Sequence, residues 1–364
     1  MIGSGSAGID NANLQAVAMT VEQVIERWDG EEVVARFDAP SGAWMLVCIH
    51  SRRLGPAAGG TRMKVYGSPA EALLDGTRLA AGMTAKFAVA GLPFGGGKAV
   101  LAVREIPTGD ERRTLLCRYA DVVCSLGGNY LTGCDMNTTP VDLDVIAETC
   151  RHVFGRSAGS GEPGPFTARG VFHGIRASIA HVHGSPALAG RTVLVQGVGS
   201  VGARLAAALA EDGASVLVSD VDSARAEAVA AKLGARAVDP GDALSTECDV
   251  YAPCATGSTL SEATIADLRC RIVAGAANNQ LGEAADADRL RERGVLYAPD
   301  FVINAGGVFH NIGRESLGWG DAEVEQALAG IGGTLQTIFE RSDAEGVSTG
   351  QVALDLAAEQ LVSG

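Results

Sequence analysis

One short segment restricts the fold of this chain more than any other, because a glycine-rich loop follows directly on an apolar run. Residues Thr192–Gln196 read Thr-Val-Leu-Val-Gln, which is typical of a buried parallel strand. Residues 197–202 read Gly-Val-Gly-Ser-Val-Gly and lead into a helical pattern that starts at Ser200. A strand, a tight glycine turn and a helix in this order predict a βα unit of the kind that binds dinucleotides.

The three glycines of this loop have distinct predicted roles. Gly197 permits the tight turn, Gly199 lets the backbone approach a pyrophosphate, and Gly202 lets the helix pack on the strand. The first turn of the helix offers unpaired N–H groups and a positive dipole to that anion. We therefore predict a dinucleotide site, and a glycine turn without a ligand is the alternative. The predicted contacts are Gly197, Val198, Gly199, Ser200, Val201 and Gly202.

An acidic residue ends the next predicted strand. Asp220 lies close to the spacing of roughly 20 residues at which an acid accepts the ribose hydroxyls. Its charge would repel a 2′-phosphate, and no arginine follows it immediately, so the sequence favours NAD over NADP. Two alternatives stay open: Asp222 could be the ribose ligand, and Asp220 could be a solvated turn residue.

Strand and helix patterns alternate through the second half of the chain, which predicts a parallel sheet with helices on both faces. The length of 364 residues exceeds the roughly 250–300 residues that one core organises. We therefore predict an α/β fold with two domains, at 1–160 and 161–346, and a final helix at about 347–364 that returns to the first domain. The predicted strands are 191–196, 215–220, 249–252, 271–274 and 295–298, and the predicted helices are 167–183, 200–212, 223–232, 321–340 and 350–361.

The first half has a mixed pattern. Two strands, 31–38 and 43–50, flank a turn with proline and glycine. Proline and acidic residues after Ser68 start a helix that should run to about Thr84. Further predictions are a helix at 107–126, a helix that starts after Thr139, a loose terminus at 1–18, and a hinge in the Gly-, Ser- and Pro-rich segment 155–165.

Composition excludes several classes of protein. The net charge is −14 and no basic run occurs, which argues against a nucleic-acid-binding protein. No apolar stretch is long enough to cross a membrane, and the first residues lack the basic segment of a secretory signal. The eight cysteines form no Cys-x-x-Cys pair and the histidines show no metal-ligand spacing, so we expect free thiols and no metal site. These features predict a cytoplasmic protein.

Two lysines lie in unusually apolar surroundings. Lys86 sits in Gly-Met-Thr-Ala-Lys-Phe-Ala-Val-Ala, and Lys98 ends Pro-Phe-Gly-Gly-Gly-Lys. Burying an ammonium group is costly unless it is paired, so such a lysine tends to have a lowered pKa or to hold an anion. The alternative is that each side chain extends to solvent from the end of an element.

Three polar segments accompany the lysines. Residues 59–62, Gly-Gly-Thr-Arg, are expected to form a loop that exposes its backbone, and residues 132–138 a polar loop with one strong acid, Asp135. Residues 304–307, Asn-Ala-Gly-Gly, should follow a strand at 300–303, where ligands collect in open α/β sheets.

Together these motifs resemble the glutamate/leucine/phenylalanine/valine dehydrogenase family, from about residue 29 to 346. They occur in family order: Gly-Gly-Thr-Arg, Pro-Phe-Gly-Gly-Gly-Lys, Thr-Gly-Cys-Asp at 132–135, the dinucleotide loop, Ala-Gly-Ala-Ala-Asn-Asn at 274–279, and the segment 297–307. The resemblance implies NAD-dependent oxidative deamination of an L-amino acid to a 2-oxo acid and ammonia. It also implies a first domain for substrate binding and assembly into a homo-oligomer, a Rossmann-like NAD-binding domain, and a cleft between them.

The resemblance also implies individual roles. Lys98 would be the general base and Asp135 a proton shuttle at the amino group. Lys86 and Asn304 would bind the substrate carboxylate, beside Gly59 and Gly60. Thr167, Ala276 and Asn278 would lie at the nicotinamide.

The side-chain pocket decides which amino acid reacts. Branched-chain members of the family usually carry larger residues where this chain has Ala58 and Gly133, which should widen the pocket for an aromatic ring. We therefore predict L-phenylalanine, with leucine or valine as the alternative. Two other hypotheses are a catalytically inactive NAD-binding sensor and an amine dehydrogenase. The presence of Lys98 and Asp135 argues against the first, and that of Lys86 and Asn304 against the second.

Overall fold

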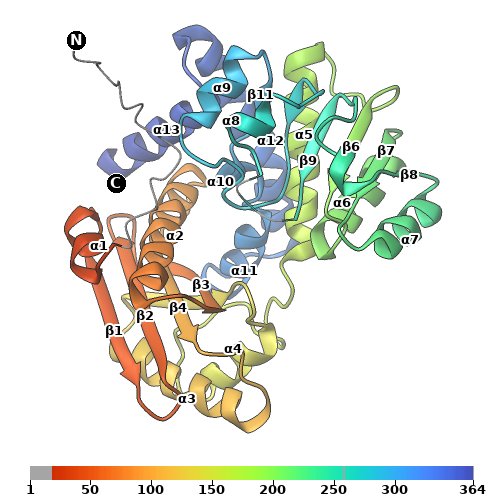
Figure 1. Cartoon of the computed structure of the whole chain (residues 1–364). Coiled ribbons are helices and arrows are strands. Elements are labelled where there is room, and N and C mark those ends of the chain that lie inside the picture. The colour runs from red at the N-terminus through yellow and green to blue at the C-terminus, as the bar shows by residue number, and fades with distance from the viewer. Residues whose placement is uncertain (1–18, 256, 258, 364) are drawn as a thin grey trace, which may run out of the picture.

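Two separate β-sheets organise the computed structural model, which describes residues 19–255, 257 and 259–363 (Figure 1). The predicted loose terminus at 1–18 therefore lies outside the described residues. The first sheet has the order β1-β2-β4-β3-β5, and the second has the order β11-β10-β9-β6-β7-β8. The predicted two-domain α/β fold is thus confirmed, while the domain limits at 160 and 346 stay predictions.

The first sheet is mixed. Strand β2 pairs antiparallel with both β1 and β4, whereas β3 pairs parallel with β4 and β5. Alternate side chains of β2 pack into two different hydrophobic cores. Met45, Val47 and Ile49 lie in one, and Leu46 and Cys48 lie in the other. The strands are β1 (Glu32–Asp38), β2 (Ala43–Ser51), β3 (Ala57–Val65), β4 (Gly95–Val103) and β5 (Tyr130–Cys134).

Helices cover both faces of this sheet. Helix α2 (Pro69–Val89) begins at the cap Ser68, as predicted, but runs five residues past Thr84 and therefore carries Lys86 in its last turn. Helix α4 (Pro140–Ala147) begins with the predicted capping box, in which Thr139 and Asp142 bond reciprocally. The other helices are α1 (Val21–Arg27) and α3 (Gly109–Ser125).

Two loop predictions in this domain need correction. Residues 59–62 are part of strand β3, and residues 132–134 are part of β5, so that only 135–138 form the predicted polar loop. Lys98 lies within strand β4. The glycines serve close packing here. A Cβ atom at Gly59 would lie 1.8 Å from the carbonyl oxygen of Gly97 on the neighbouring strand.

The second sheet is entirely parallel, as the alternating pattern predicted. Val193 and Val195 of β6 face the main core, and Leu194 faces a second cluster on the other side. Residues 300–303 form a short helix and not the predicted strand, because the amides of Val302 and Ile303 bond to the Pro299 carbonyl. The strands are β6 (Thr192–Gln196), β7 (Ser215–Ser219), β8 (Arg236–Ala237), β9 (Val250–Pro253), β10 (Ile272–Val273) and β11 (Leu296–Tyr297).

The helices of the second half surround this sheet, and the last of them returns to the first domain. Helix α13 (Thr349–Ser363) packs against α2 as well as against α9 and β11 (Figure 1). None of the helices in the described part of the chain is long and apolar enough to cross a membrane. The remaining helices are α5 (Gly164–His183), α6 (Ser200–Glu211), α7 (Ser223–Leu233), α8 (Glu262–Ile265), α9 (Asp286–Glu292), α10 (Asp300–Ile303), α11 (Gly306–Ser316), α12 (Asp321–Glu345) and a 3₁₀ turn, Pro240–Asp242.

The predicted hinge segment connects α4 to α5 and is held by helix α11. Glu315 accepts hydrogen bonds from the amides of Gly155 and Ser160, at 2.9 and 2.7 Å. His310 contacts the Ser160 carbonyl at 2.8 Å and stacks on Phe166. One helix of the second domain therefore fixes the path of the connection between the domains.

Candidate active site

A cleft of about 290 Å³ is lined by residues from both domains. Helix α2 and strands β3 to β5 form one wall, and helices α5, α6, α10 and α11 contribute to the other. The structure brings together nine of the predicted site residues along this cleft: Gly60, Lys86, Lys98, Asp135, Thr167, Val201, Ala276, Asn278 and Asn304.

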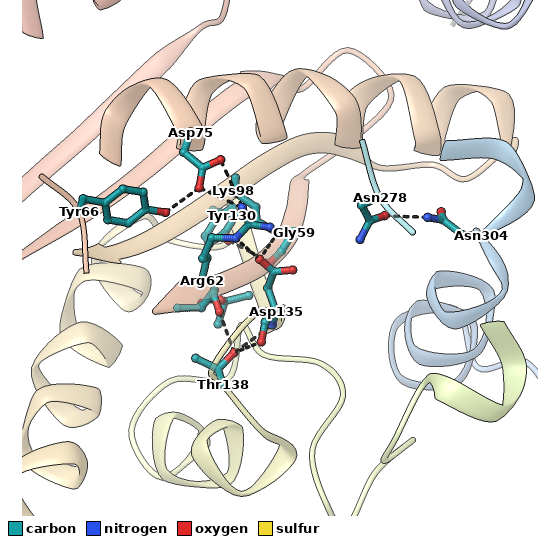
Figure 2. Close-up of polar contacts among 12 residues, drawn as sticks. Gly59, Arg62, Tyr66, Asp75, Lys98, Tyr130, Asp135, Thr138, Asn278 and Asn304 are labelled. Atoms are coloured by element: carbon teal, nitrogen blue, oxygen red, sulfur yellow. Dashed lines mark hydrogen bonds and ion pairs between the residues drawn. The ribbon is translucent and has the colours of Figure 1, made fainter. Parts of the chain in front are cut away.

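Lys98 and Asp135 form an ion pair on the first-domain wall (Figure 2). Lys98 Nζ lies 3.0 Å from Asp135 Oδ2, and Lys98 is 5% exposed. Arg62 Nε contacts the same oxygen at 2.7 Å. The Asp135 backbone is fixed as well, because its amide donates to Thr138 Oγ1 and that hydroxyl donates to the Thr61 carbonyl.

This arrangement sets the charge states of the pair. Burial raises the pKa of Asp135, but the nearby Lys98 and Arg62 outweigh it and lower the pKa to about 2. Burial lowers the pKa of Lys98, opposed by Asp135 and supported by Arg62. The site thus combines an always ionised carboxylate with a lysine that loses its proton more readily than a solvated one, which suits a general base.

Lys86 lies on the same wall and reaches across the cleft. Its Nζ donates to Asn304 Oδ1 at 2.7 Å. Asn304 Nδ2 donates to the Ala276 carbonyl at 3.1 Å and to Asn278 Oδ1 at 2.7 Å, the latter contact shown in Figure 2. Burial lowers the pKa of Lys86 to about 8, with a smaller contribution from Lys98 and opposition from Asp300. Lys86 and Asn304, predicted to act together, are therefore in direct contact.

Of the glycine loop, Val201 lines this cleft, whereas Gly197, Val198, Gly199, Ser200 and Gly202 do not. The backbone of the loop nevertheless fits the pyrophosphate of a dinucleotide. Gly197 has a φ of +91°, which only glycine adopts readily, and a Cβ atom at Gly202 would lie 1.9 Å from the Gly197 carbonyl oxygen. A Cβ atom at Gly199 would meet nothing within 4 Å, so the loop is open there. Ser200 begins helix α6 without a side-chain cap, which leaves its first amides available.

Asp220 lies beside this loop but is already engaged. Its carboxylate accepts from the amides of Val198 and Asp222, both at 2.9 Å. Arg225 of α7 approaches both of its oxygens at 3.4 Å. These contacts keep the pKa of Asp220 low despite its burial. No arginine follows Asp220 immediately in the sequence, but helix α7 brings Arg225, five residues further on, to its carboxylate.

Thr167 lies in the first turn of α5, where its hydroxyl donates to the Pro163 carbonyl at 3.1 Å. A Cβ atom at Gly307 would lie 2.7 Å from this hydroxyl, so glycine is needed for the close approach of α5 and α11. Thr167 of α5 and Val201 of α6 both line the cleft.

The predicted widening of the pocket is not found. Ala58 is fully buried in the core and does not line the cleft. A Cβ atom at Gly133 would lie 2.4 Å from the ring of Phe154, so that ring already occupies the volume that the missing side chain releases. Gly59 also stays behind the cleft, where its carbonyl accepts from the Tyr130 hydroxyl at 2.9 Å.

Sequence reasoning gave no role to several residues that line the cleft, among them Arg62, Phe154 and Asn311. Arg62 belongs to a motif that the sequence singled out, yet nothing assigned its guanidinium to Asp135. Phe154 and Asn311 had no sequence signal, because they enter the cleft from the hinge region and from α11. The Oδ1 atom of Asn311 is buried and has no hydrogen-bond partner among the described residues.

The charged groups of the cleft, Lys86, Lys98 and Asp135, suit a reaction of an organic acid that requires a cofactor. Two amines and an ionised carboxylate face a loop shaped for a dinucleotide. Within the described ranges, no group of three or more His, Cys, Asp or Glu side chains could hold a metal ion. All eight cysteines are free thiols. Fold and site together define a two-domain, dinucleotide-dependent oxidoreductase.

Comparison with known proteins then gives the family. The model of the Glu/Leu/Phe/Val dehydrogenase dimerisation domain matches residues 43–152, and that of Glutamate/Leucine/Phenylalanine/Valine dehydrogenase matches residues 223–360. The chain belongs to this family of amino-acid dehydrogenases, which are NAD(P)-dependent oxidoreductases that act on CH–NH₂ donors.

Similar proteins act on several amino acids. The chain is 40% identical to leucine dehydrogenase of Bacillus subtilis, with 94% of each chain covered. It is 41% identical to valine dehydrogenase of Streptomyces albus, with 91% of each covered. The crystal structure of L-tryptophan dehydrogenase from Nostoc punctiforme superimposes with a TM-score of 0.80 at 37% identity, over 95% of this chain and 100% of that one.

Proposed function

We propose that this protein catalyses the reversible NAD-dependent oxidative deamination of a branched-chain L-amino acid, leucine or valine, to its 2-oxo acid and ammonia. The observation that carries the chemistry is the meeting of Lys98–Asp135 and Lys86–Asn304 in one cleft opposite the glycine loop. A scaffold protein without activity would not need to maintain the buried Lys98 and the half-buried Lys86 in one cleft, because withdrawing each amine from water costs desolvation energy.

The residues have separate tasks in this proposal. Lys86, held by Asn304, takes the substrate carboxylate and orients the Cα atom toward the nicotinamide side. When bound, NAD would accept the hydride from Cα. Asp135 stays ionised and accepts a hydrogen bond from the amino group, while neutral Lys98 takes a proton from the water that attacks the imine carbon and passes it to the departing nitrogen. Ammonia then leaves and the 2-oxo acid remains.

The preference for NAD rests on the acid beside the loop. Asp220 stays ionised and its carboxylate faces the place where a 2′-phosphate would enter. Arg225 reduces this repulsion, since it pairs with Asp220 at 3.4 Å. We therefore expect Asp220→Ser to improve the use of NADP through the released Arg225, and Arg225→Ala to leave NAD strongly preferred.

Branched-chain substrates are favoured over phenylalanine by two observations. Phe154 fills the space at Gly133 that an aromatic substrate was expected to use. The similar leucine and valine dehydrogenases also extend over more than nine-tenths of the chain. The phenylalanine prediction thus has less support than its alternative.

An aromatic substrate is the second candidate. The chain is 41% identical to L-tryptophan dehydrogenase of Nostoc punctiforme, over 87% of this chain and 89% of that protein. The amide of Asn311 in the cleft has an unpartnered Oδ1, which could accept from an indole N–H.

A panel of L-amino acids assayed by NAD reduction at 340 nm tests both candidates. We expect the highest kcat/KM with leucine or valine, and a preference for tryptophan or phenylalanine would favour the second candidate. Lys98→Ala should lower kcat by about 10²–10⁴-fold with unchanged NADH binding. The exposed Lys232→Ala is the matched control. A wild-type protein inactive on the whole panel would leave the NAD-binding sensor as the remaining hypothesis.

A further inference from the structure

Arg62 makes contacts that substrate binding does not require. It extends from β3 into the cleft, yet its side chain is only 12% exposed and its guanidinium is fixed on two sides. Nε contacts Asp135 Oδ2 at 2.7 Å, and Nη1 contacts Asp75 Oδ1 and Oδ2 at 3.2 and 2.9 Å (Figure 2). A planar guanidinium held between two carboxylates by two of its nitrogens has a defined orientation.

The second carboxylate is fixed in turn. Tyr66 donates its hydroxyl to Asp75 Oδ2 at 2.6 Å. Tyr66, Asp75, Arg62 and Asp135 therefore form a continuous chain of hydrogen bonds that runs from outside the cleft to the carboxylate at its centre (Figure 2). Every bond after the first joins charged groups in a partly buried setting, where such bonds are stronger than on the surface.

The two cations on Asp135 use the same oxygen. Lys98 Nζ and Arg62 Nε both contact Oδ2, and no hydrogen bond or ion pair between described side chains uses Oδ1. Both cations therefore hold Asp135 by Oδ2, and Oδ1 remains available for a ligand in the cleft.

We propose that Arg62 is a positioning residue of the reaction, which, backed by Asp75 and Tyr66, holds Asp135 by Oδ2 so that Oδ1 receives the substrate's amino group. This inference rests on the proposed deamination. It gives a function to Arg62, the arginine of the Gly-Gly-Thr-Arg segment. In the described structure this arginine forms no hydrogen bond with the glycine loop or with Lys86.

Arg62 also affects the neighbouring base. Four charged groups face Lys98: Asp135 and Asp75 favour its protonated form, whereas Arg62 and Lys86 disfavour it. Loss of the Arg62 charge therefore raises the pKa of Lys98, and the protein then needs a higher pH to obtain the neutral amine.

Two substitutions separate orientation from charge. Arg62→Gln removes both, so kcat should fall by about 10- to 100-fold. The rising limb of the kcat/KM–pH profile should also shift toward higher pH by about 0.5–1 pH unit. Arg62→Lys keeps the charge but cannot bridge Asp75 and Asp135 as a planar fork, so kcat should fall while the limb stays in place.

Arg112→Gln is the matched control. Arg112 also forms a bidentate pair with a buried aspartate in the first domain, through Asp142 at 2.6 and 2.7 Å, but it does not line the cleft. The Arg112→Gln substitution should lower thermal stability without changing kcat or the pH profile. An Arg62→Gln protein with kcat within about twofold of wild type and an unmoved limb, or an identical change in Arg112→Gln, would overturn the proposal.

Two further measurements keep the test decisive. If Arg62→Gln does not fold, Tyr66→Phe and Asp75→Asn probe the same chain of bonds, and unchanged kcat in both overturns the proposal. The titration of Lys98 can also be followed by NMR after ¹³C reductive methylation, with Lys98→Arg to assign the signal. This readout needs no turnover. An inactive wild type would thus refute the proposed deamination, while an unshifted Lys98 titration in Arg62→Gln would refute the role of Arg62.

Discussion

The ammonium of Lys86 has to stay protonated to hold a carboxylate, yet its pKa is lowered to about 8 because the cleft removes its hydration. Binding of a carboxylate should therefore weaken above pH 8, by about tenfold for each further pH unit. The Ki of 4-methylpentanoate, which has no amino group to titrate, measures this directly.

The control for this experiment is Lys86→Arg, because arginine stays charged throughout the accessible range. Its Ki should be weaker at neutral pH but flat up to pH 10. A wild-type Ki that does not change between pH 7 and 10 would remove Lys86 from carboxylate recognition.

Single residues show where sequence reasoning succeeds and where it stops. That Lys86 and Lys98 need partners could be predicted, because charged residues in apolar segments are costly to bury alone. Their grouping with Asp135 followed from the resemblance to the dehydrogenase family. The shape of the substrate pocket could not be predicted. The ring of Phe154 fills the space at Gly133 from 21 positions along the chain, and neither segment alone indicates that contact.

Within the βα turn, two glycine substitutions should have opposite effects. Gly202→Ala places a methyl group against the Gly197 carbonyl, so α6 must shift and the protein should lose stability. Gly199→Ala meets no protein atom, so stability should be retained while a pyrophosphate can no longer approach the backbone. Thermal unfolding and NADH titration by fluorescence test the pair. Wild-type NADH affinity in Gly199→Ala would contradict the assignment of this loop.

Helix α11 should control the connection between the domains through Glu315. Replacement by alanine leaves the amides of Gly155 and Ser160 without their acceptor, which should lower the free energy of unfolding by about 1–3 kcal/mol. The substrate KM should rise as well, since the segment positions the walls of the cleft. Glu325→Ala breaks an exposed pair with Arg169 and is the control, with an expected cost below about 1 kcal/mol. Equal unfolding energies for the two variants would argue against this role.

At the level of elements, the regular alternation of the second domain could be read from the sequence. Strands β1 and β2 of the first domain could be read as well, since strands at 31–38 and 43–50 were predicted. Strands β3, β4 and β5 could not, because glycine and proline normally indicate turns. In β3 and β4 the glycines instead let neighbouring backbones and α2 approach closely. A Cβ atom at Gly96 would lie 2.1 Å from the Thr84 amide. These glycines are required by contacts between segments that are distant in the sequence. A local sequence pattern carries no information about such contacts.

For the whole molecule we expect a homo-oligomer. Strand β1 forms the outer edge of the first sheet, and Phe37 on it is 48% exposed beside Trp44. The part of the chain that matches the dimerisation-domain model forms the rest of this sheet. Light scattering after gel filtration should give a multiple of 37.2 kDa, and Phe37→Lys should shift the population toward smaller species. A mass of one chain at every concentration would contradict this expectation.

The packing of α13 on α2 has a consequence for biosynthesis. A ribosome makes the first domain early, but the helix that carries Lys86 gains this neighbour only after the entire second domain has been translated. Until then part of α2 is uncovered on a nascent chain, where chaperones can bind it. Competence to react would therefore appear only after α13 has been translated, and a premature stop before Thr349 would leave the helix that carries Lys86 without this support.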